Sequence, residues 1–151
     1  MPTRRQTLRH GLAAGGAIGL ASFGATDARA FNKPAFDAKT LQDAMRALGA
    51  TSFTESKDVS ISGPEISENG ATVPVSAAST LPGLRQLAVL VEKNPSLLSA
   101  VFNLNDAIDA SFSLRVKMAE SSNVYAVAIG RDGKAYFARR EIKVTLGGCA
   151  A

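Results

Sequence analysis

The larger part of this 151-residue sequence predicts an all-β fold: an antiparallel sandwich that carries one short N-terminal helix and a flexible C-terminal arm. Two observations support this prediction. From residue 59 onward, short apolar runs alternate with polar residues at a period of two, the pattern of strands that have one buried face. Turn-forming residues separate these runs at short intervals, which is typical of strands that follow one another in antiparallel sheets.

The strongest strand signals lie in the middle of the chain. Leu84–Val91 is nearly all apolar and predicts a central strand, although periodicity does not tell whether Leu87, Val89 and Val91 are core or face a partner. Residues 111–118 alternate cleanly. The side chains expected to point inward there are Phe112, Leu114, Val116 and Met118. Together with shorter runs at 59–61, 72–76 and 100–104, these patterns predict about seven strands and an immunoglobulin-like sandwich.

The last two strands are predicted at residues 123–129 and 134–146, joined by a hairpin turn at residues 130–133, Gly-Arg-Asp-Gly. Along the final strand Ile142, Val144 and Leu146 are expected to face inward. The adjacent Arg139 and Arg140 interrupt the alternation, which predicts a bulge there. Pro74, in the run 72–76, is expected at an edge or bulged position because proline donates no backbone hydrogen bond.

One helix is predicted from about residue 37 to residue 48. Four apolar residues follow helical spacing, namely Leu41, Ala44, Met45 and Leu48. Asp37 or Thr40 would cap its start, and Gly49 would end it.

The N-terminus has the pattern of an export signal. The consecutive Arg4 and Arg5 precede a weakly apolar stretch at residues 11–23, and an Ala-Arg-Ala cleavage pattern follows at residues 28–30. This arrangement predicts a twin-arginine signal over residues 1–30 and export to the periplasm, and the stretch is too short to span a membrane. A basic N-terminal helix that stays on the protein is the alternative. The sandwich would then occupy residues 31–146 and the arm residues 147–151.

The basic charge of the chain belongs mostly to this signal. The sequence has 17 Lys+Arg and 13 Asp+Glu, and residues 1–30 contribute four of the basic and one of the acidic residues, which leaves 17 − 4 = 13 and 13 − 1 = 12. A net charge of +1 gives no reason to expect a nucleic-acid partner. About 120 residues remain, enough for one domain with its own core.

The residues that are missing exclude several kinds of enzyme site. His10, the single histidine, lies in the signal, so the mature chain cannot form a Ser-His-Asp or Cys-His arrangement. One cysteine is too few for a zinc site or for c-type haem attachment. We therefore expect no catalytic residue, no metal and no cofactor, and we expect a protein that other enzymes act upon.

That single cysteine, Cys149, stands third from the C-terminus, after Gly147 and Gly148 and before two alanines. The glycines leave the backbone free to adopt many conformations, and the cysteine has no second cysteine in the chain to pair with. The tail is thus predicted to be a carrier arm, with Cys149 as its reactive group and the glycines as its hinge. The thiolate is the reactive form, and a free thiol with a pKa of about 8.5 supplies only a few per cent of it at neutral pH.

These features together resemble the SoxY family of sulfur-substrate carriers. The matching features are the twin-arginine signal, the N-terminal helix, the segment 64–75 (PEISENGATVPV), Asn94-Pro95, the Asp132-Gly133 turn and the closing 144–149 (VTLGGC). The family tail usually ends Gly-Gly-Cys-Gly-Gly, whereas this chain has Ala150 and Ala151. Alanine disfavours positive φ angles and so restricts the tail.

The resemblance implies a mechanism and a set of partners. A SoxZ-like subunit would form a heterodimer with this chain, and Cys149 would carry the sulfur intermediates. SoxAX, a c-type cytochrome enzyme, would couple thiosulfate to Cys149. The metal-dependent hydrolase SoxB would then release sulfate, and SoxCD would in some systems oxidise the remaining sulfane.

Two alternatives stay open. Cys149 in an exported protein can form an intermolecular disulfide in a homodimer, or it can be incidental on an exported binding module. Prenylation does not fit, because it requires a cysteine fourth from the end. Separately, Arg139, Arg140 and Lys143 suggest a cationic approach for anionic adducts, although a solvated strand face explains them more simply.

Overall fold

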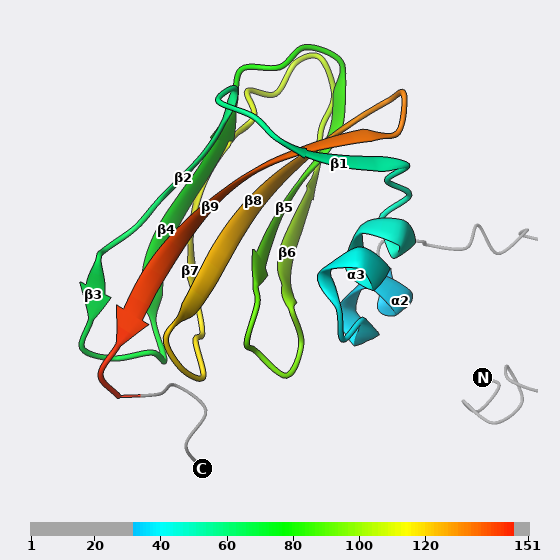
Figure 1. Cartoon of the computed structure of the whole chain (residues 1–151). Helices are drawn as coiled ribbons and strands as arrows, with labels where there is room; N and C mark the ends of the chain where they lie inside the picture. Colours follow the sequence, from blue (N-terminus) through cyan, green and yellow to red (C-terminus); the bar gives the residue numbers. More distant parts are fainter. Residues whose placement is uncertain (1–31, 147–151) are drawn as a thin grey trace, which may run out of the picture.

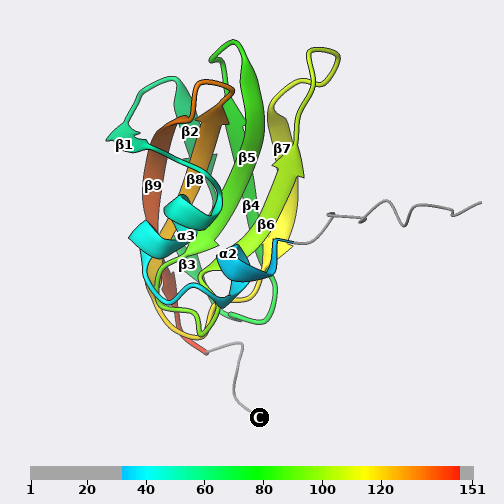
Figure 2. The ribbon, with the colours of Figure 1, turned by 90° about the vertical axis from the view of Figure 1, so that its right-hand side faces the viewer.

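The computed structural model describes residues 32–146; the predicted signal and the predicted arm lie outside the described residues. Two β-sheets pack face to face, and two short helices lie against the outer face of the larger sheet (Figures 1 and 2). The predicted β-sandwich with an N-terminal helical segment is therefore confirmed.

The elements in chain order are α2 (Lys33–Asp37), α3 (Leu41–Ala47), β1 (Ser52–Glu55), β2 (Val59–Ser62), β3 (Ile66–Ser67), β4 (Val73–Ser79), β5 (Leu84–Val91), β6 (Leu98–Asn103), β7 (Ser111–Val116), β8 (Ser122–Gly130) and β9 (Lys134–Val144). The larger sheet has the order β1-β9-β8-β5-β6, with β3 also paired to β9, and the smaller sheet has the order β2-β4-β7. All pairings are antiparallel except those of β1 and β3, which run parallel to β9. The sequence did not predict these two short strands.

The core consists of two layers that share β5. Leu87, Val89 and Val91 are fully buried between the two sheets, whereas Ala88 and Leu90 are fully buried under the helices. Both faces of β5 are thus covered within the chain, which explains why its sequence is apolar without interruption from Leu87 to Val91. Leu87, Val89 and Val91, for which the sequence did not distinguish core from partner surface, therefore belong to the core.

The helical segment differs from its prediction. The expected helix is α3, which starts at Leu41, and a second helix, α2, precedes it and ends where Ala38 is extended (φ −59°, ψ 136°). Thr40 then caps α3 by accepting a hydrogen bond from the Asp43 amide at 3.1 Å, as one of the two predicted caps. Gly49 follows α3 with a φ of +77°, the left-handed conformation expected of a helix stop.

The predicted hairpin between β8 and β9 is confirmed, with Gly133 at φ +83°. The bulge predicted at Arg139 and Arg140 is wrong, because the β8–β9 register is continuous from Ser122 to Ile129. The register shifts fall on β5 instead. Arg140 stays exposed in a regular strand, since a long arginine side chain reaches solvent from such a position.

Pro74 lies where β4 is paired on one side. It stands opposite Arg115 of β7, while β2 ends at Ser62, opposite Ser76. At Pro74, β4 is therefore an edge strand on one side, as predicted. A proline has no N–H to donate, and this has no cost where no second strand would accept the hydrogen bond.

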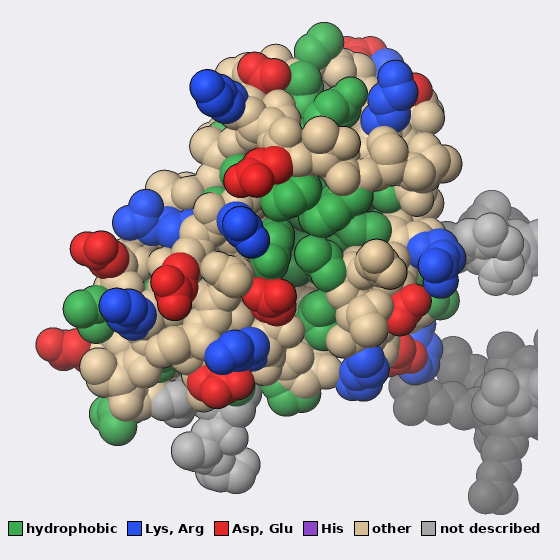
Figure 3. Space-filling model, in the orientation of Figure 1, with side chains coloured by type: hydrophobic (Ala, Val, Ile, Leu, Met, Phe, Trp, Pro, Cys, Tyr) green, Lys and Arg blue, Asp and Glu red, His purple; other side chains and the backbone are tan. Residues whose placement is uncertain are grey.

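The helix-side face is shown in Figure 3, where hydrophobic side chains gather below β1 and beside α3. Phe53 of β1 and Phe137 of β9 belong to the half-buried rim of the helix-side cluster, and their rings stack at 4.1 Å. The parallel pairing of β1 with β9 is what brings these rings together.

Candidate functional site

The candidate site is the place where the chain leaves β9 toward Cys149. Cys149, Gly147 and Gly148 lie outside the described residues, as do Arg4 and Arg5 of the predicted signal. The structure does describe the chain up to Leu146, three residues before the thiol. We call residues 143–146 the arm root.

Three backbone hydrogen bonds hold the arm root to residues 65–70, the stretch that contains β3 and precedes β4. The Lys143 amide donates to the Glu65 carbonyl at 3.0 Å, and the Thr145 amide donates to the Ser67 carbonyl at 3.1 Å. In the opposite direction, the Gly70 amide donates to the Leu146 carbonyl at 2.8 Å. The ladder therefore continues to the last described residue, two positions beyond the end of β9.

Side chains reinforce this attachment from two loops. The Thr145 hydroxyl donates to the Glu68 carbonyl at 3.0 Å. The Ser121 hydroxyl, from the loop between β7 and β8, accepts from the Val144 amide at 2.9 Å and donates to its carbonyl at 3.4 Å. The arm root is thus fixed on both sides up to Leu146, the last described residue.

The segment 65–70 is itself tied to the sandwich. Gly70 is buried, and its carbonyl accepts from the Met118 amide at 2.7 Å, just past the end of β7. This segment falls within the run 64–75 that carried the family resemblance. The structure gives that run a physical role, since it connects the end of β7 to the arm root.

The anchor limits how far the thiol can travel. At 3.3–3.6 Å per extended residue, Cys149 lies at most about 10 Å beyond Leu146. A group on such a tether can enter a narrow cleft of another protein while the sandwich stays outside.

Leu146 differs from its prediction. It was expected to face inward with Ile142 and Val144, but its side chain is 70% exposed. The reason is that β9 ends at Val144, so Leu146 lies beyond the part of β9 that the smaller sheet covers.

The three basic residues near the arm do not form one cluster. Arg139 and Lys143 share one face of β9, and Arg140 points to the other, because successive residues of a strand alternate. Lys143 alone belongs to the arm root. Among the described residues, no group of three or more His, Cys, Asp or Glu side chains could hold a metal ion.

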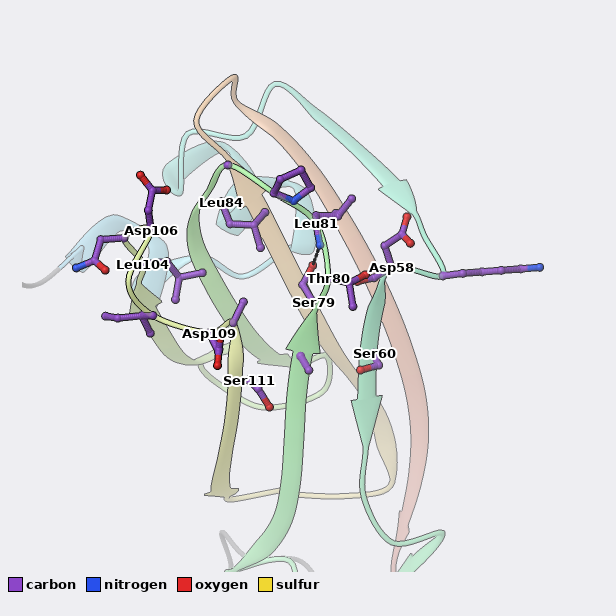
Figure 4. Close-up of a pocket in the computed structure, with 17 residues that line it drawn as sticks. Asp58, Ser60, Ser79, Thr80, Leu81, Leu84, Leu104, Asp106, Asp109 and Ser111 are labelled. Atoms are coloured by element: carbon purple, nitrogen blue, oxygen red, sulfur yellow. Dashed lines mark hydrogen bonds between the residues drawn. The ribbon is translucent and has the colours of Figure 1, made fainter.

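A cleft of about 740 Å³ lies at the other end of the sandwich (Figure 4). Asp58, Asp109 and Ser111 are among its lining residues, which come from the start of β2, the end of β4 and the loop before β7. Since β4 runs from the arm-root end to this cleft over seven residues, the two are separated by about 20 Å. The arm's own reach of about 10 Å does not bridge that distance.

Comparison with known proteins decides the family. The model of the family described as "Sulfur oxidation protein SoxY" matches residues 44–149, from within α3 to Cys149. This chain belongs to the SoxY family. A search of curated sequences found no match.

The solved structure of a SoxY protein agrees with this assignment. The sulfur carrier protein SoxY from Chlorobium limicola f thiosulfatophilum is 37% identical, with a TM-score of 0.65, and the match covers 71% of this chain and 97% of that one. A superoxide reductase (neelaredoxin) from Ignicoccus hospitalis is 20% identical, with a TM-score of 0.48 and coverage of 60% and 82%. Within residues 32–146 of this SoxY-family chain, no helix is long and apolar enough to cross a membrane.

Sequence analysis missed the residues that fix the arm root. Thr145 and Glu68 are 77 positions apart, and Ser121 and Val144 are 23 apart, so no local pattern links them. The one available signal was that Thr145 and Ser121 are polar residues next to strand ends. This alone does not predict which residues they contact.

Proposed function

We propose that this SoxY-family chain is a covalent sulfur carrier that holds thiosulfate-derived intermediates on Cys149. The observation that supports the proposal most directly is the arm root: a strand end fixed by six hydrogen bonds stands three residues before the single thiol. The family match, which ends at that thiol, supports it further.

The chemistry requires an oxidant and then water. The Cys149 thiolate and the terminal sulfur of thiosulfate form an S–S bond, and two electrons leave to the haem of SoxAX, which gives Cys–S–S–SO₃⁻. SoxB then adds water, so that sulfate departs with its oxygen and two protons are released, leaving Cys–S–S⁻. SoxCD would oxidise this sulfane where it is present, and further hydrolysis would return the thiol.

In this scheme the chain itself catalyses nothing. Its contribution is to hold the thiol at a fixed distance from a rigid domain, which confines it to a small volume around the docked partner and so raises its effective concentration there. A SoxZ-like subunit would complete the carrier as a heterodimer. Export by the twin-arginine route would bring it to the periplasm, where the partner enzymes act.

The proposal is tested by reconstitution with purified components. The chain lacking residues 1–30 is incubated with its SoxZ-like partner, thiosulfate and oxidised SoxAX, and its mass is then measured. We expect a gain of about 112 Da, the mass of S₂O₃ added to the thiolate, and none for Cys149→Ser. Addition of SoxB should reduce the gain to about 32 Da, one retained sulfur on the same thiolate chemistry. An unmodified wild-type mass, or equal modification of Cys149→Ser, would refute the proposal.

A further inference from the structure

The two sheets end on the same side of the sandwich, where β6 and β7 are the last strands of their sheets (Figure 2). Within residues 32–146, β6 pairs only with β5, and β7 pairs only with β4. Proteins usually protect such edge strands with charged residues, prolines or bulges, because their outer backbone groups are unpaired. The segment 98–104 (LSAVFNL), which contains β6, has no charged residue, proline or glycine. Its one register shift lies at its start, between Val89 and Leu90 of β5, so residues 100–104 are regular.

The hydrogen-bonding pattern identifies which backbone groups of β6 face outward. The Leu104 amide donates to the Arg85 carbonyl at the start of β5, at 2.9 Å. Backbone groups of successive residues point alternately to the two sides of a strand. The N–H and C=O of Phe102 therefore also point toward β5, whereas those of Val101 and Asn103 point away from the sheet.

The inner face of this edge is apolar. Phe102 pairs with Leu87 of β5, which is fully buried between the sheets, so Phe102 also faces the smaller sheet. Its ring stacks on that of Phe112 of β7, with centroids 4.1 Å apart and planes at 3°. Both rings are half-buried. The stack thus connects the two edge strands, and its outer side is left for a partner to cover.

We propose that β6 pairs antiparallel with β6 of a second copy of this chain, about a two-fold axis at Phe102. In this register Phe102 lies opposite its own symmetry mate, and Ala100 lies opposite Leu104, which packs against the same core. The outward N–H and C=O of Val101 exchange hydrogen bonds with those of Asn103 of the second copy. Directly opposite residues without mutual hydrogen bonds have the closest side chains, and aromatic pairs there stabilise a sheet.

A second copy fits this edge because the edge is complementary to itself. Every pair on the inner face is apolar in the proposed register. Lys93 and Asp106, the nearest charged residues along the chain, lie outside the paired segment, so no like charges face each other. Dimers with two-fold symmetry are also the most common oligomers of soluble proteins.

The pairing leaves the arm root free. The combined sheet has the order β9-β8-β5-β6 followed by the same four strands in reverse, so the two β9 strands are seven strand spacings, or about 33 Å, apart. Two arms of about 10 Å each do not bridge that distance. The proposed dimer is therefore distinct from a disulfide dimer through Cys149, and it is independent of the proposed carrier function.

The test is the oligomeric state of the purified chain in reducing buffer, measured by sedimentation equilibrium. We expect wild type and Cys149→Ser to be dimers. Val101→Pro removes an N–H that only the pairing uses, and it should raise the dimer dissociation constant about 25-fold, fivefold for each of two symmetry-related hydrogen bonds. The matched control is Glu55→Pro, at the opposite edge of the sheet. There the Ser56 amide binds the Phe137 carbonyl and the Glu55 N–H points outward, so the dimer should be unchanged.

Hydrogen exchange of wild type gives a second readout that requires no substitution. When the concentrated dimer is diluted to monomer, the amides of Val101 and Asn103 should lose protection. The amide of Phe102, which points toward β5, should keep it. Equal behaviour of the three amides would overturn the proposed register even if Val101→Pro failed to fold.

Other outcomes would overturn the second copy as the occupant. These are a monomeric wild type, a folded Val101→Pro that dimerises as wild type does, and a Glu55→Pro that dissociates. A dimer lost in Cys149→Ser would be a disulfide dimer instead. Protection of the Val101 and Asn103 amides only on addition of a SoxZ-like subunit would assign the edge to that subunit. Absence of mass adducts on Cys149 would refute the carrier function and leave this pairing untouched.

Discussion

The Ser121 hydroxyl is the single side chain that we expect to control how firmly the arm root is held. It pairs with both backbone groups of Val144, at 2.9 Å and 3.4 Å, and Ser121→Ala removes both contacts. A hydrogen bond in a half-buried place contributes about 1 kcal/mol net, which corresponds to about a fivefold change in an equilibrium constant. Counting only the 2.9 Å bond, because the 3.4 Å contact is long and weak, the opening equilibrium of the arm root should rise about fivefold.

Amide hydrogen exchange measures this opening directly. In Ser121→Ala the amides of Val144 and Thr145 should exchange about five times faster than in wild type, whereas amides in the centre of β8 should change only as global stability does. Ser113→Ala is the matched control, since its hydroxyl contacts the Ser76 hydroxyl at 2.7 Å on the outer face of the smaller sheet. Exchange at Val144 and Thr145 that equals wild type would refute the argument that Ser121 anchors the arm.

Three further predictions concern the framework that carries the arm, each measured by urea unfolding. Leu87→Ala and Leu90→Ala should each lower the free energy of unfolding by about 3–5 kcal/mol, because both side chains are fully buried, on opposite faces of β5. A loss below about 1 kcal/mol at either site would contradict the two-layer core. Gly133→Ala should lower the free energy of unfolding by about 1 kcal/mol, because alanine disfavours the φ of +83° at this position. Gly83 has a φ of +67° and open space around it, so Gly83→Ala tests backbone strain alone and should lower the free energy of unfolding by about the same amount. Arg85 donates hydrogen bonds to the carbonyls of Leu48 and Gly49, which follow α3, and to the carbonyl of Gly130 at the end of β8. Arg85→Met removes them and should lower the free energy of unfolding by about 2 kcal/mol. An unchanged free energy of unfolding would show that these bonds do not hold the helices.

The central strands could be predicted from sequence because their signals are local. A nearly all-apolar run gave β5, and a strict alternation gave β7, with Val116 at its end and Met118 just beyond it both buried. The turn Gly-Arg-Asp-Gly gave the β8–β9 hairpin. In each case the pattern and the structure depend on neighbouring residues of the same segment.

The parts that were missed depend on residues distant in sequence. β3 is two residues long and has no pattern of its own; it is a strand because Ile66 and Ser67 pair with Lys143 and Val144. The predicted helix is present as α3, with Thr40 as its cap, but it starts at Leu41, and the five-residue α2 before it was missed because it carries no apolar periodicity of its own.

The candidate site likewise has one part that is local in the sequence and one part that depends on distant residues. Its proposed reactive residue, Cys149, could be named from the sequence, because a single cysteine after two glycines is a local feature. Its anchor was not, since Ser121, Glu68 and Gly70 reach the arm root only through the folded chain. Leu146 is exposed because β9 ends at Val144, and the alternation of apolar and polar residues did not predict that end.

The most direct test of the account is the intact mass of the exported protein, isolated without reductant from cells grown on thiosulfate and compared with Cys149→Ser. The account predicts adducts of about 112 Da, or about 32 Da per sulfane sulfur, that disappear with the thiol that bears them. It also predicts that Cys149→Ser cells fail to oxidise thiosulfate. A wild-type protein found only as bare thiol or as a disulfide dimer, together with a variant that still supports thiosulfate oxidation, would contradict it.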